Sequence, residues 1–398
     1  MIDSVGKACI GCGACESECI QKCISFVIDE EGFLFPNIDH SVCVECNRCE
    51  KVCPCLAKIE ERNIVDSSIF GVRSKKELES EVLDSASAGV FYFLAEYFIK
   101  HKGYVYGAIF DEDHYVKHIV ATQMADVKRM QNSKYVQSDI RGIYSSIRGV
   151  LENNEDAHVL FSGTPCQCYG LKTFLGNAEY KHLLIVDLVC HGVPSPLLLK
   201  KYIGYLEHKY KEPTKIFKFR CKNKGWNYKG YMCSYVKFNN RYWPVPADPY
   251  MQAYLKGANY RESCYECKYN SSRKASDLTM ADFAGIENIA PAFFSRAGCS
   301  EVFIHTPQGE RFINMIKNKI ELIDLSWNQL EGYGASYKQQ RQRHKDRDLS
   351  YQEIGEISDE EFVKLRLKRY VTVKGLIRFY TPYFIRKIIR KTRNGRAS

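Results

Sequence analysis

Apolar and polar positions alternate along most of the chain in a way that predicts short strands followed by amphipathic helices. Residues 104–110 form an apolar run of strand length, and the longer periodic segment 196–210 predicts a helix that Ser195 caps. The same patterns predict strands at 117–122, 159–162, 183–189, 278–281 and 302–305, and helices at 140–152, 167–175, 250–256 and 309–319. Strands that alternate with helices predict a mixed α/β core with a partly parallel sheet.

Other stretches depart from this alternation. Near the start, apolar residues 24–28 and 33–35 flank Asp29-Glu30-Glu31-Gly32, which predicts a hairpin with glycine in its turn. Residues 215–245 are β-rich, with strands expected near 216–220 and 231–238. Ser85-Ala86-Ser87-Ala88-Gly89 precedes apolar residues 90–94 and predicts a helix start with a serine cap. Residues 339–348 are charged and glutamine-rich, so we expect an exposed connector there.

Length and composition narrow the class of protein. A chain of 398 residues allows two or three domains, and 45% apolar with 26% charged residues is typical of a soluble globular protein. The best candidate for a membrane span, residues 88–99, is short and contains Glu96, so it predicts a buried helix. Eighteen cysteines in a long chain that begins without a charged leader and apolar segment indicate metal binding in a reducing cytoplasm.

The net charge of +10 is concentrated at the end of the chain. From Lys364 to Ser398 there are twelve Lys or Arg and no Asp or Glu, which leaves 45 basic against 47 acidic residues before it. Here four apolar residues at helical spacing stand beside four basic ones: Phe384, Ile385, Ile388, Ile389 and Arg386, Lys387, Arg390, Lys391. This pattern suits peripheral contact with an anionic membrane. A disordered solubilising end is the alternative, and RNA binding lacks an accompanying aromatic motif, so we expect no specific nucleic acid.

A cysteine spacing that occurs twice in the first 54 residues carries the first candidate chemistry. The spacing C-x2-C-x2-C-x3-C is that of the bacterial ferredoxin run, and its members are Cys9, Cys12, Cys15, Cys19 and Cys43, Cys46, Cys49, Cys53. In that run the fourth cysteine of each copy binds the other cluster, so we group Cys53 with the first three and Cys19 with the second three. Zinc is the alternative, although its sites favour two separated pairs. Cys23 and Cys55 are interpreted as packed or spare thiols.

A third site is predicted further along the chain. Cys264 and Cys267 form a fresh C-x2-C pair, whose spacing lets two thiolates converge on one metal group. Four thiolates result if Cys166 and Cys190 join them, with Cys168 as the rival to Cys166. Three other cysteines are expected to be inert packed thiols: Cys221, Cys233 and Cys299.

The chain resembles the beta-subunit family of coenzyme F-420 hydrogenases and dehydrogenases over roughly residues 1–310. Besides the ferredoxin run, the resemblance rests on Ser133-Lys134-Tyr135-Val136-Gln137-Ser138, Gly163-Thr164-Pro165-Cys166-Gln167, Val189-Cys190-His191-Gly192-Val193-Pro194-Ser195-Pro196, Phe219-Arg220 with Gly225-Trp226, and Cys264-x2-Cys267 followed by Ser276-Asp277-Leu278-Thr279-Met280-Ala281-Asp282-Phe283. It implies an iron-sulfur flavoprotein with FAD in the α/β core and a third 4Fe-4S cluster near it. The family's usual Gly-Gly and Asp-Phe-Trp are here Ala88-Gly89 and Asp282-Phe283-Ala284.

Candidate residues for the flavin and for catalysis follow from this resemblance and from elementary chemistry. Helix N-termini and cationic side chains bind phosphate groups favourably. We therefore assign the following residues to the flavin site: Ser85, Ser87, Gly89, Ser133, Lys134, Tyr135, Arg220 and Lys222. An ordinary serine cap and a solvated loop are the alternatives for these groups. His191, beside Cys190, could donate a proton or tune the cluster, or satisfy local backbone instead. No G-x-G-x-x-G follows a strand, so NAD(P)H is not the expected donor.

Together these features predict a ferredoxin-like domain with two 4Fe-4S clusters at 1–60, an α/β core at 61–212, a part with the third-cluster ligands at 213–335, and a connector with a basic helical tail at 336–398. We expect an oxidoreductase that passes electrons from its clusters through FAD to a small-molecule substrate, in surface-polysaccharide biosynthesis by family association. The alternatives are an electron-transfer beta subunit of a hydrogenase or dehydrogenase complex, including F-420 reduction, and a zinc-stabilised binding module. A ferredoxin or a dehydrogenase subunit is the expected redox partner.

Overall fold

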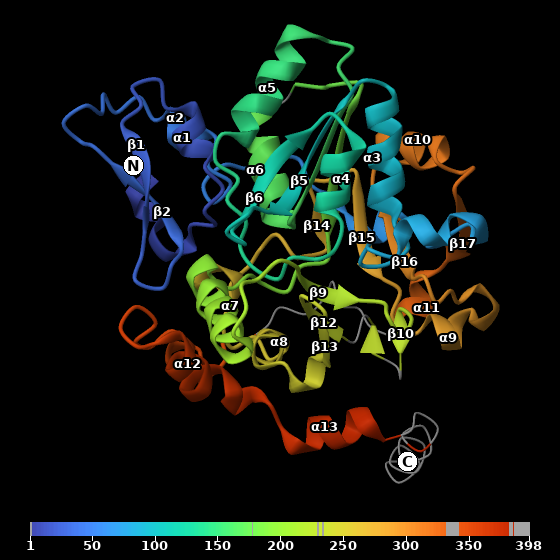
Figure 1. Cartoon of the computed structure of the whole chain (residues 1–398). Helices are drawn as coiled ribbons and strands as arrows, with labels where there is room; N and C mark the ends of the chain where they lie inside the picture. Colours follow the sequence, from blue (N-terminus) through green and yellow to red (C-terminus); the bar gives the residue numbers. More distant parts are fainter. Residues whose placement is uncertain are drawn as a thin grey trace.

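The core of the protein is an eight-stranded mixed sheet (Figure 1). The computed structural model describes residues 2–176, 178–228, 231–232, 235–331, 342–381 and 385. Across the sheet the strands run in the order β17 (Ile320–Leu325), β4 (Ser68–Ser74), β16 (Cys299–Ile304), β15 (Leu278–Asp282), β8 (Leu183–Leu188), β7 (Val159–Gly163), β5 (Tyr104–Phe110) and β6 (Val116–Ala121). The central neighbours β15, β8, β7 and β5 are parallel and the outer pairs are antiparallel, which confirms the predicted mixed α/β core.

Helices cover both faces of this sheet. Because side chains alternate along a strand, Val105 and Ile109 of β5 point to one face and Tyr106 to the other. The first face carries α3 (Val90–Lys100), α4 (Met124–Met130) and α10 (Pro307–Met315), and the second carries α5 (Ile143–Asn153) and α6 (Pro165–Leu175). Most predicted elements are found within a few residues, whereas β4, α4 and β17 were not foreseen.

The N-terminal unit lies beside the sheet, in blue in Figure 1. It consists of η1 (Ile2–Ala8), α1 (Ala14–Glu18), the hairpin β1 (Ile24–Ile28) with β2 (Leu34–Ile38), and α2 (Arg48–Lys51), and the hairpin is as predicted. Gly32 in its turn has φ +90°, and a Cβ there would meet Leu197 of α7 at 2.2 Å. Glycine therefore lets the hairpin turn and also approach α7 closely.

A smaller β-rich layer lies below the main sheet in Figure 1. Strands β9 (Phe217–Cys221), β12 (Tyr235–Phe238) and β13 (Arg241–Pro244) form an antiparallel sheet that packs with α7 (Pro196–Tyr210) and α8 (Pro249–Leu255). Ser195 caps α7 as predicted. The strand expected at 231–238 is interrupted, because β11 (Tyr231–Met232) pairs with β10 (Asn227–Tyr228) instead; Cys233 lies outside the described residues.

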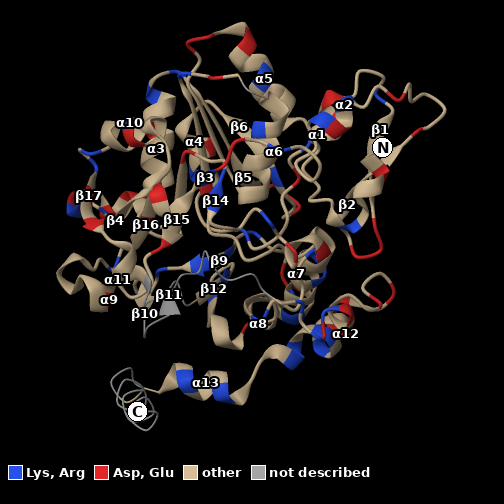
Figure 2. Cartoon of the chain, turned by 180° about the vertical axis from the view of Figure 1, so that it is seen from behind, with Lys and Arg blue, Asp and Glu red and all other residues tan. Residues whose placement is uncertain are grey.

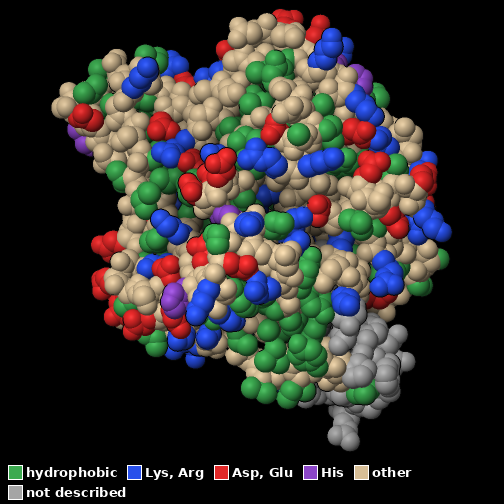
Figure 3. Space-filling view, in the orientation of Figure 1, with side chains coloured by type: hydrophobic (Ala, Val, Ile, Leu, Met, Phe, Trp, Pro, Cys, Tyr) green, Lys and Arg blue, Asp and Glu red, His purple; other side chains and the backbone are tan. Residues whose placement is uncertain are grey.

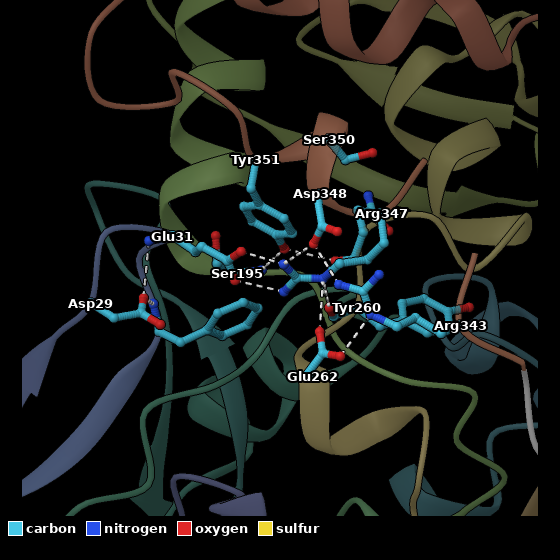
Figure 4. A network of polar contacts seen from close by, with 12 residues as sticks. Asp29, Glu31, Ser195, Tyr260, Glu262, Arg343, Arg347, Asp348, Ser350 and Tyr351 are labelled. Carbon is cyan, nitrogen blue, oxygen red and sulfur yellow. Dashed lines mark hydrogen bonds and ion pairs between the residues drawn. The ribbon is translucent and has the colours of Figure 1, made fainter. Parts of the chain in front are cut away.

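The C-terminal segment corrects one prediction. Residues 339–341 lie outside the described residues. Residues 342, 343, 345 and 348 are exposed as predicted, but Arg347 is only 2% exposed, so the segment is anchored to the body rather than a free connector. Arg347 bonds Glu31 of the N-terminal hairpin and the carbonyl oxygen of Tyr260 (Figure 4). Further on, α12 (Asp359–Phe362) and the following π-turn Val363–Leu367 bury apolar side chains against α7 and α8, and α13 (Val373–Tyr380) comes next. The predicted amphipathic stretch 384–391 lies outside the described residues except for Ile385.

Strand β3 (Arg62–Asn63) pairs with β14 (Arg273–Lys274) in a separate two-stranded sheet. The described residues also contain the short helices η2 (Ile64–Asp66), η3 (Lys76–Val82), η4 (Val245–Ala247), η5 (Glu262–Cys264), α9 (Ile286–Ile289), η6 (Pro291–Phe293), α11 (Trp327–Glu331), η8 (Asp348–Ser350) and η10 (Lys368–Tyr370). Within the described residues, no helix is both long enough and apolar enough to cross a bilayer.

Candidate metal centres

The two cysteine runs share a backbone conformation as well as a spacing. In the first run Gly11 and Gly13 have left-handed φ values of +68° and +74°, and Gly13 precedes α1. The equivalent residues of the second run, Glu45 and Asn47, have φ values of +51° and +58°, and Asn47 precedes α2. Left-handed conformations are uncommon for residues other than glycine, so their repetition at matching positions indicates two equivalent binding loops.

The first cysteine site consists of Cys9, Cys12, Cys15 and Cys53, the grouping that we predicted. All four line one cavity of about 20 Å³, together with apolar residues such as Val5 and Ile10. Burial raises the pKa of the Cys12 thiol well above its usual range and that of Cys15 to about 12. Such thiols ionise only when a cation compensates their charge, and four that converge suit an iron-sulfur cluster.

The second cysteine site consists of Cys19, Cys43, Cys46 and Cys49 and lies closer to the surface. Cys46 is exposed, and Cys19, Cys43 and Cys49 pack at the edge of one apolar cluster with the first site. Cys23, interpreted from sequence as a spare thiol, has its Sγ 3.4 Å from that of Cys19. Interactions with Cys19 and then burial raise the pKa of Cys23 to about 12, and Cys43 also contacts it. Cys19 and Cys43 therefore meet across the two runs around Cys23.

The third cysteine site brings together segments that are far apart in the sequence. Cys166 lies in the first turn of α6, Cys190 follows β8, Cys264 ends η5, and Cys267 lies three residues later. The start of α6 is fixed by a capping box between Thr164 and Gln167. All four cysteines line one cavity of about 60 Å³. The predicted set therefore converges at the carboxyl end of a parallel strand.

The electrostatics of the third site also suit a bound metal cluster. Burial raises the pKa of all four thiols, to about 12 for Cys264, and neighbouring cysteines raise the pKa values of Cys166, Cys190 and Cys264 further. Cys168, the rival to Cys166, is fully buried, and its Sγ lies 3.6 Å from the carbonyl oxygen of Val186 in the sheet core. It does not line the cavity, so the geometry favours Cys166.

Arg261 and Gln137 join the third site to the first and were missed as functional residues. Arg261 is 1% exposed, and its guanidinium donates to the carbonyl oxygens of Cys9 (2.8 Å) and Leu34 (2.9 Å) and to Gln137 Oε1 (3.0 Å). Gln137 in turn donates to the carbonyl oxygen of Ile10 (2.9 Å). Both line the third-site cavity. Gln137 belongs to a motif quoted above, whereas Arg261 carries no sequence signal beyond standing three residues before Cys264.

Two more residues lie where the first and third sites meet. Tyr269 packs beside Cys166 and Cys267, and its hydroxyl is 3.6 Å from Cys55 Sγ. Cys55, predicted to be a spare thiol, has its pKa lowered to about 6, chiefly by a hydrogen bond with Cys53. His191 lines the third-site cavity, as expected for the residue after Cys190.

Four of the residues that we assigned to a flavin meet at the loop 82–89, which contains Ser85, Ser87 and Gly89 and is contacted by Lys222. Gly89, with φ +83°, is the N-cap residue of α3, so the predicted serine cap is wrong. The two serines bond elsewhere: Ser87 Oγ donates to the Cys299 carbonyl oxygen (2.5 Å), and Ser85 Oγ accepts from Gln131 (3.0 Å). Lys222 Nζ donates to the carbonyl oxygens of Ser87 (2.6 Å) and Val82 (2.9 Å).

The other assigned cations have protein partners too. Lys134 Nζ lies 3.0 to 3.2 Å from four carbonyl oxygens, those of residues 129–132 at the end of α4. Arg220 forms an ion pair of 2.7 Å with Asp282, and Ser133 and Tyr135 flank Lys134. As these side chains stand, their positive charges do not form an open phosphate site, so they do not fit a flavin phosphate.

Comparison with known proteins finds a match for the N-terminal unit and another for the later part of the chain. Residues 156–326 match the family described as the C-terminal part of the coenzyme F420 hydrogenase/dehydrogenase beta subunit, and residues 8–57 match the "4Fe-4S dicluster domain". Residues 156–326 are therefore assigned to the C-terminal domain family of the coenzyme F-420 hydrogenase/dehydrogenase beta subunits. The match for a dicluster domain decides between the two interpretations of the cysteine runs in favour of iron-sulfur clusters over zinc.

Two similar proteins come from Methanosarcina species. A subunit of the F(420)H(2) dehydrogenase of Methanosarcina mazei is 23% identical over 333 residues, which cover 79% of this chain and 84% of that protein. A chain in a structure of the F420-reducing [NiFe] hydrogenase complex from Methanosarcina barkeri aligns with a TM-score of 0.45 at 16% identity, over 77% of this chain and 93% of that one. The match over residues 156–326 and the dehydrogenase relative support a redox role.

Proposed function

We propose that this protein is an electron-transfer iron-sulfur subunit of a hydrogenase-like or dehydrogenase-like complex, with 4Fe-4S clusters at the first, second and third cysteine sites. The observation that carries the proposal is the contact between sites: Ile10 lines both the first-site and the third-site cavity. A bound 4Fe-4S cluster supplies one-electron transfer. Two cluster sites separated by one side chain are suited to exchange of electrons.

The residues around the sites perform three tasks in this proposal. The thiolates would hold the iron, and the apolar side chains of Val5 and Ile10 exclude water from it. Arg261 holds the carbonyl oxygen of Cys9, which fixes the loop of the first site against the third. Burial raises the pKa of both Cys9 and Cys264, and the nearby positive charge of Arg261 offsets part of that rise.

The order of the three cysteine sites supports electron transfer from the surface of the protein toward its interior. The second site has the exposed Cys46 and, around it, Ile20, Val42 and Val44 with exposed fractions of 66%, 46% and 61%. The first site is buried between the second and the third. We propose that a redox partner, a ferredoxin or another subunit of the complex, docks at the second site. The relative named as part of a dehydrogenase supports a partner of the latter kind.

Flavin-dependent reduction of a small-molecule substrate is a second candidate, because Lys222 meets Ser87 at the loop 82–89, which also contains Ser85 and Gly89. It has less support than electron transfer, since Lys134 and Lys222 already bind backbone carbonyl oxygens and Arg220 binds Asp282. None of the reported matches points to surface-polysaccharide biosynthesis. Titration of the iron-loaded protein with FAD tests this candidate: stoichiometric binding supports it, and no binding leaves electron transfer alone.

The third cluster is tested by a matched pair of substitutions. We expect about twelve irons and twelve sulfides per chain after anaerobic reconstitution, and about eight in Cys166→Ser, because its loss opens the third site only. Cys168→Ser is the control: its thiol is equally buried but faces the sheet core, so about twelve irons should remain. Equal iron contents in both variants would remove the third cluster from the proposal.

A further inference from the structure

Helix α13 presents an apolar stripe to the outside. Val373, Ile377 and Tyr380 are 72%, 63% and 63% exposed, and their spacing of four and three residues places them on one side of the helix. Phe379 faces the body instead and is buried, with its ring 5.9 Å from that of Tyr235. Figure 3 shows hydrophobic side chains gathered on this side of the molecule, over α13. The helix is therefore anchored on one side and uncovered on the other.

Positive charge accompanies the apolar stripe. Lys374 and Arg378 are exposed on α13, and Figure 2 shows basic but no acidic residues along this helix. In the part of the chain that the structure describes, neither side chain forms an ion pair with a carboxylate. The whole sequence from Lys364 to Ser398 adds ten more basic residues and no acidic one. Charge and exposed apolar surface thus coincide in one region.

We propose that α13 is a contact for an anionic membrane surface. The stripe Val373, Ile377 and Tyr380 would enter the headgroup region, and Lys374 and Arg378 would bind lipid phosphates beside it. An acidic protein surface would pair with the basic residues but would not explain the exposed apolar stripe. RNA would pair with the same basic residues and stack on aromatic side chains, so it would not explain Val373 and Ile377. A lipid surface accounts for both features together.

The arrangement has a consequence for the proposed electron transfer. The N-terminal unit and α13 lie far apart on the molecule in both views (Figures 1 and 2). A protein bound to a membrane through α13 therefore keeps the exposed second cysteine site away from the lipid, where a partner can reach it. The membrane proposal nevertheless stands independently of the cluster content.

Flotation of the full-length, iron-loaded protein with vesicles tests the proposal. Phosphatidylcholine vesicles containing phosphatidylglycerol should carry the protein upward, and vesicles of phosphatidylcholine alone should not. Val373→Ser with Ile377→Ser should lower the partition coefficient at least about tenfold, as should Lys374→Glu with Arg378→Glu. Because these side chains are exposed, iron content and melting temperature should match the unsubstituted protein.

Two control variants carry the same kinds of substitution on surfaces away from α13. Met315→Ser removes an apolar side chain that is 49% exposed on α10, and Lys128→Glu with Lys317→Glu reverses two exposed charges. Both variants should float like the unsubstituted protein. Equal flotation with neutral vesicles, unchanged binding of the serine variant, or binding to single-stranded RNA without any binding to vesicles would each overturn the proposal.

Discussion

At the scale of single residues, burial decides the charge of the carboxyl group of Glu301. This residue lies on β16, is 4% exposed, and has its pKa raised to about 8 by burial and by the nearby Asp282. In the unfolded chain the pKa returns to the ordinary value near 4.3. Between these values the folded protein holds a proton that the unfolded chain has lost. The free energy of unfolding must therefore fall as pH rises from about 4 to about 8.

Glu301→Gln should remove this pH dependence. We expect the variant to lose the contribution of this group to the slope, which is at most about 1.4 kcal/mol per pH unit. Chemical denaturation at several pH values between 5 and 8 measures it. At pH 8 the variant should be more stable than the unsubstituted protein, whereas a slope equal to that of the unsubstituted protein would show that Glu301 is ionised in the fold.

Single residues also mark the limit of what could be predicted from sequence. The ferredoxin spacing predicted that Cys53 joins Cys9, Cys12 and Cys15, and all four line one cavity, which Cys55 lines too. Lys222 binds backbone carbonyl oxygens of a loop that is distant in the sequence, which the sequence does not reveal. Arg261 was missed for the same reason, since its role depends on where the N-terminal unit packs.

At the scale of secondary structure, the strands with continuous apolar runs were predicted well, and the edge of the sheet was not. β7 and β8 are buried on both faces over most of their length, so residues 159–161 and 183–186 form continuous apolar runs. β17 is an edge strand with Glu321 and Asp324, and its polarity resembles that of a helix or loop. Residues 339–348 were predicted to be a connector because of their charges, yet Arg347 binds Glu31 of the N-terminal hairpin and Arg343 binds Glu262 of η5.

Arg347 connects that segment to the N-terminal unit. Its guanidinium holds both carboxylate oxygens of Glu31, and its Nε donates to the carbonyl oxygen of Tyr260 at 3.1 Å (Figure 4). Nearby, the ring of Tyr351 packs on Phe33, with centroids 5.7 Å apart. The C-terminal segment thus holds the hairpin of the ferredoxin-type unit against the core.

Arg347→Met should loosen this attachment. We expect a loss of about 2 kcal/mol in the free energy of unfolding, because a buried ion pair and a hydrogen bond are broken. Amide hydrogen exchange in β1 and β2 should also become faster. Arg343→Met is the matched control, since Arg343 also binds Glu262 and Asp348 but is 39% exposed and should cost far less. Equal effects of the two substitutions would contradict a specific role for Arg347.

At the scale of the whole molecule, the three cysteine sites form a series from the surface to the carboxyl end of the central parallel strands. The second site is exposed, the first shares an apolar cluster with it, and the third is separated from the first by Ile10. The doubled cysteine run predicted two of these sites from sequence. Their order relative to the third site depends on packing between distant segments, so only the structure provides it.

Electron paramagnetic resonance of the fully reduced, iron-loaded protein tests this series most directly. Two reduced clusters in contact broaden each other's signals, so we predict a magnetic interaction between the first and third clusters. Cys46→Ser, at the second site, should preserve the interaction, whereas Cys166→Ser should abolish it together with the third cluster's signal. A spectrum in which Cys166→Ser is indistinguishable from the unsubstituted protein would contradict the proposed relay.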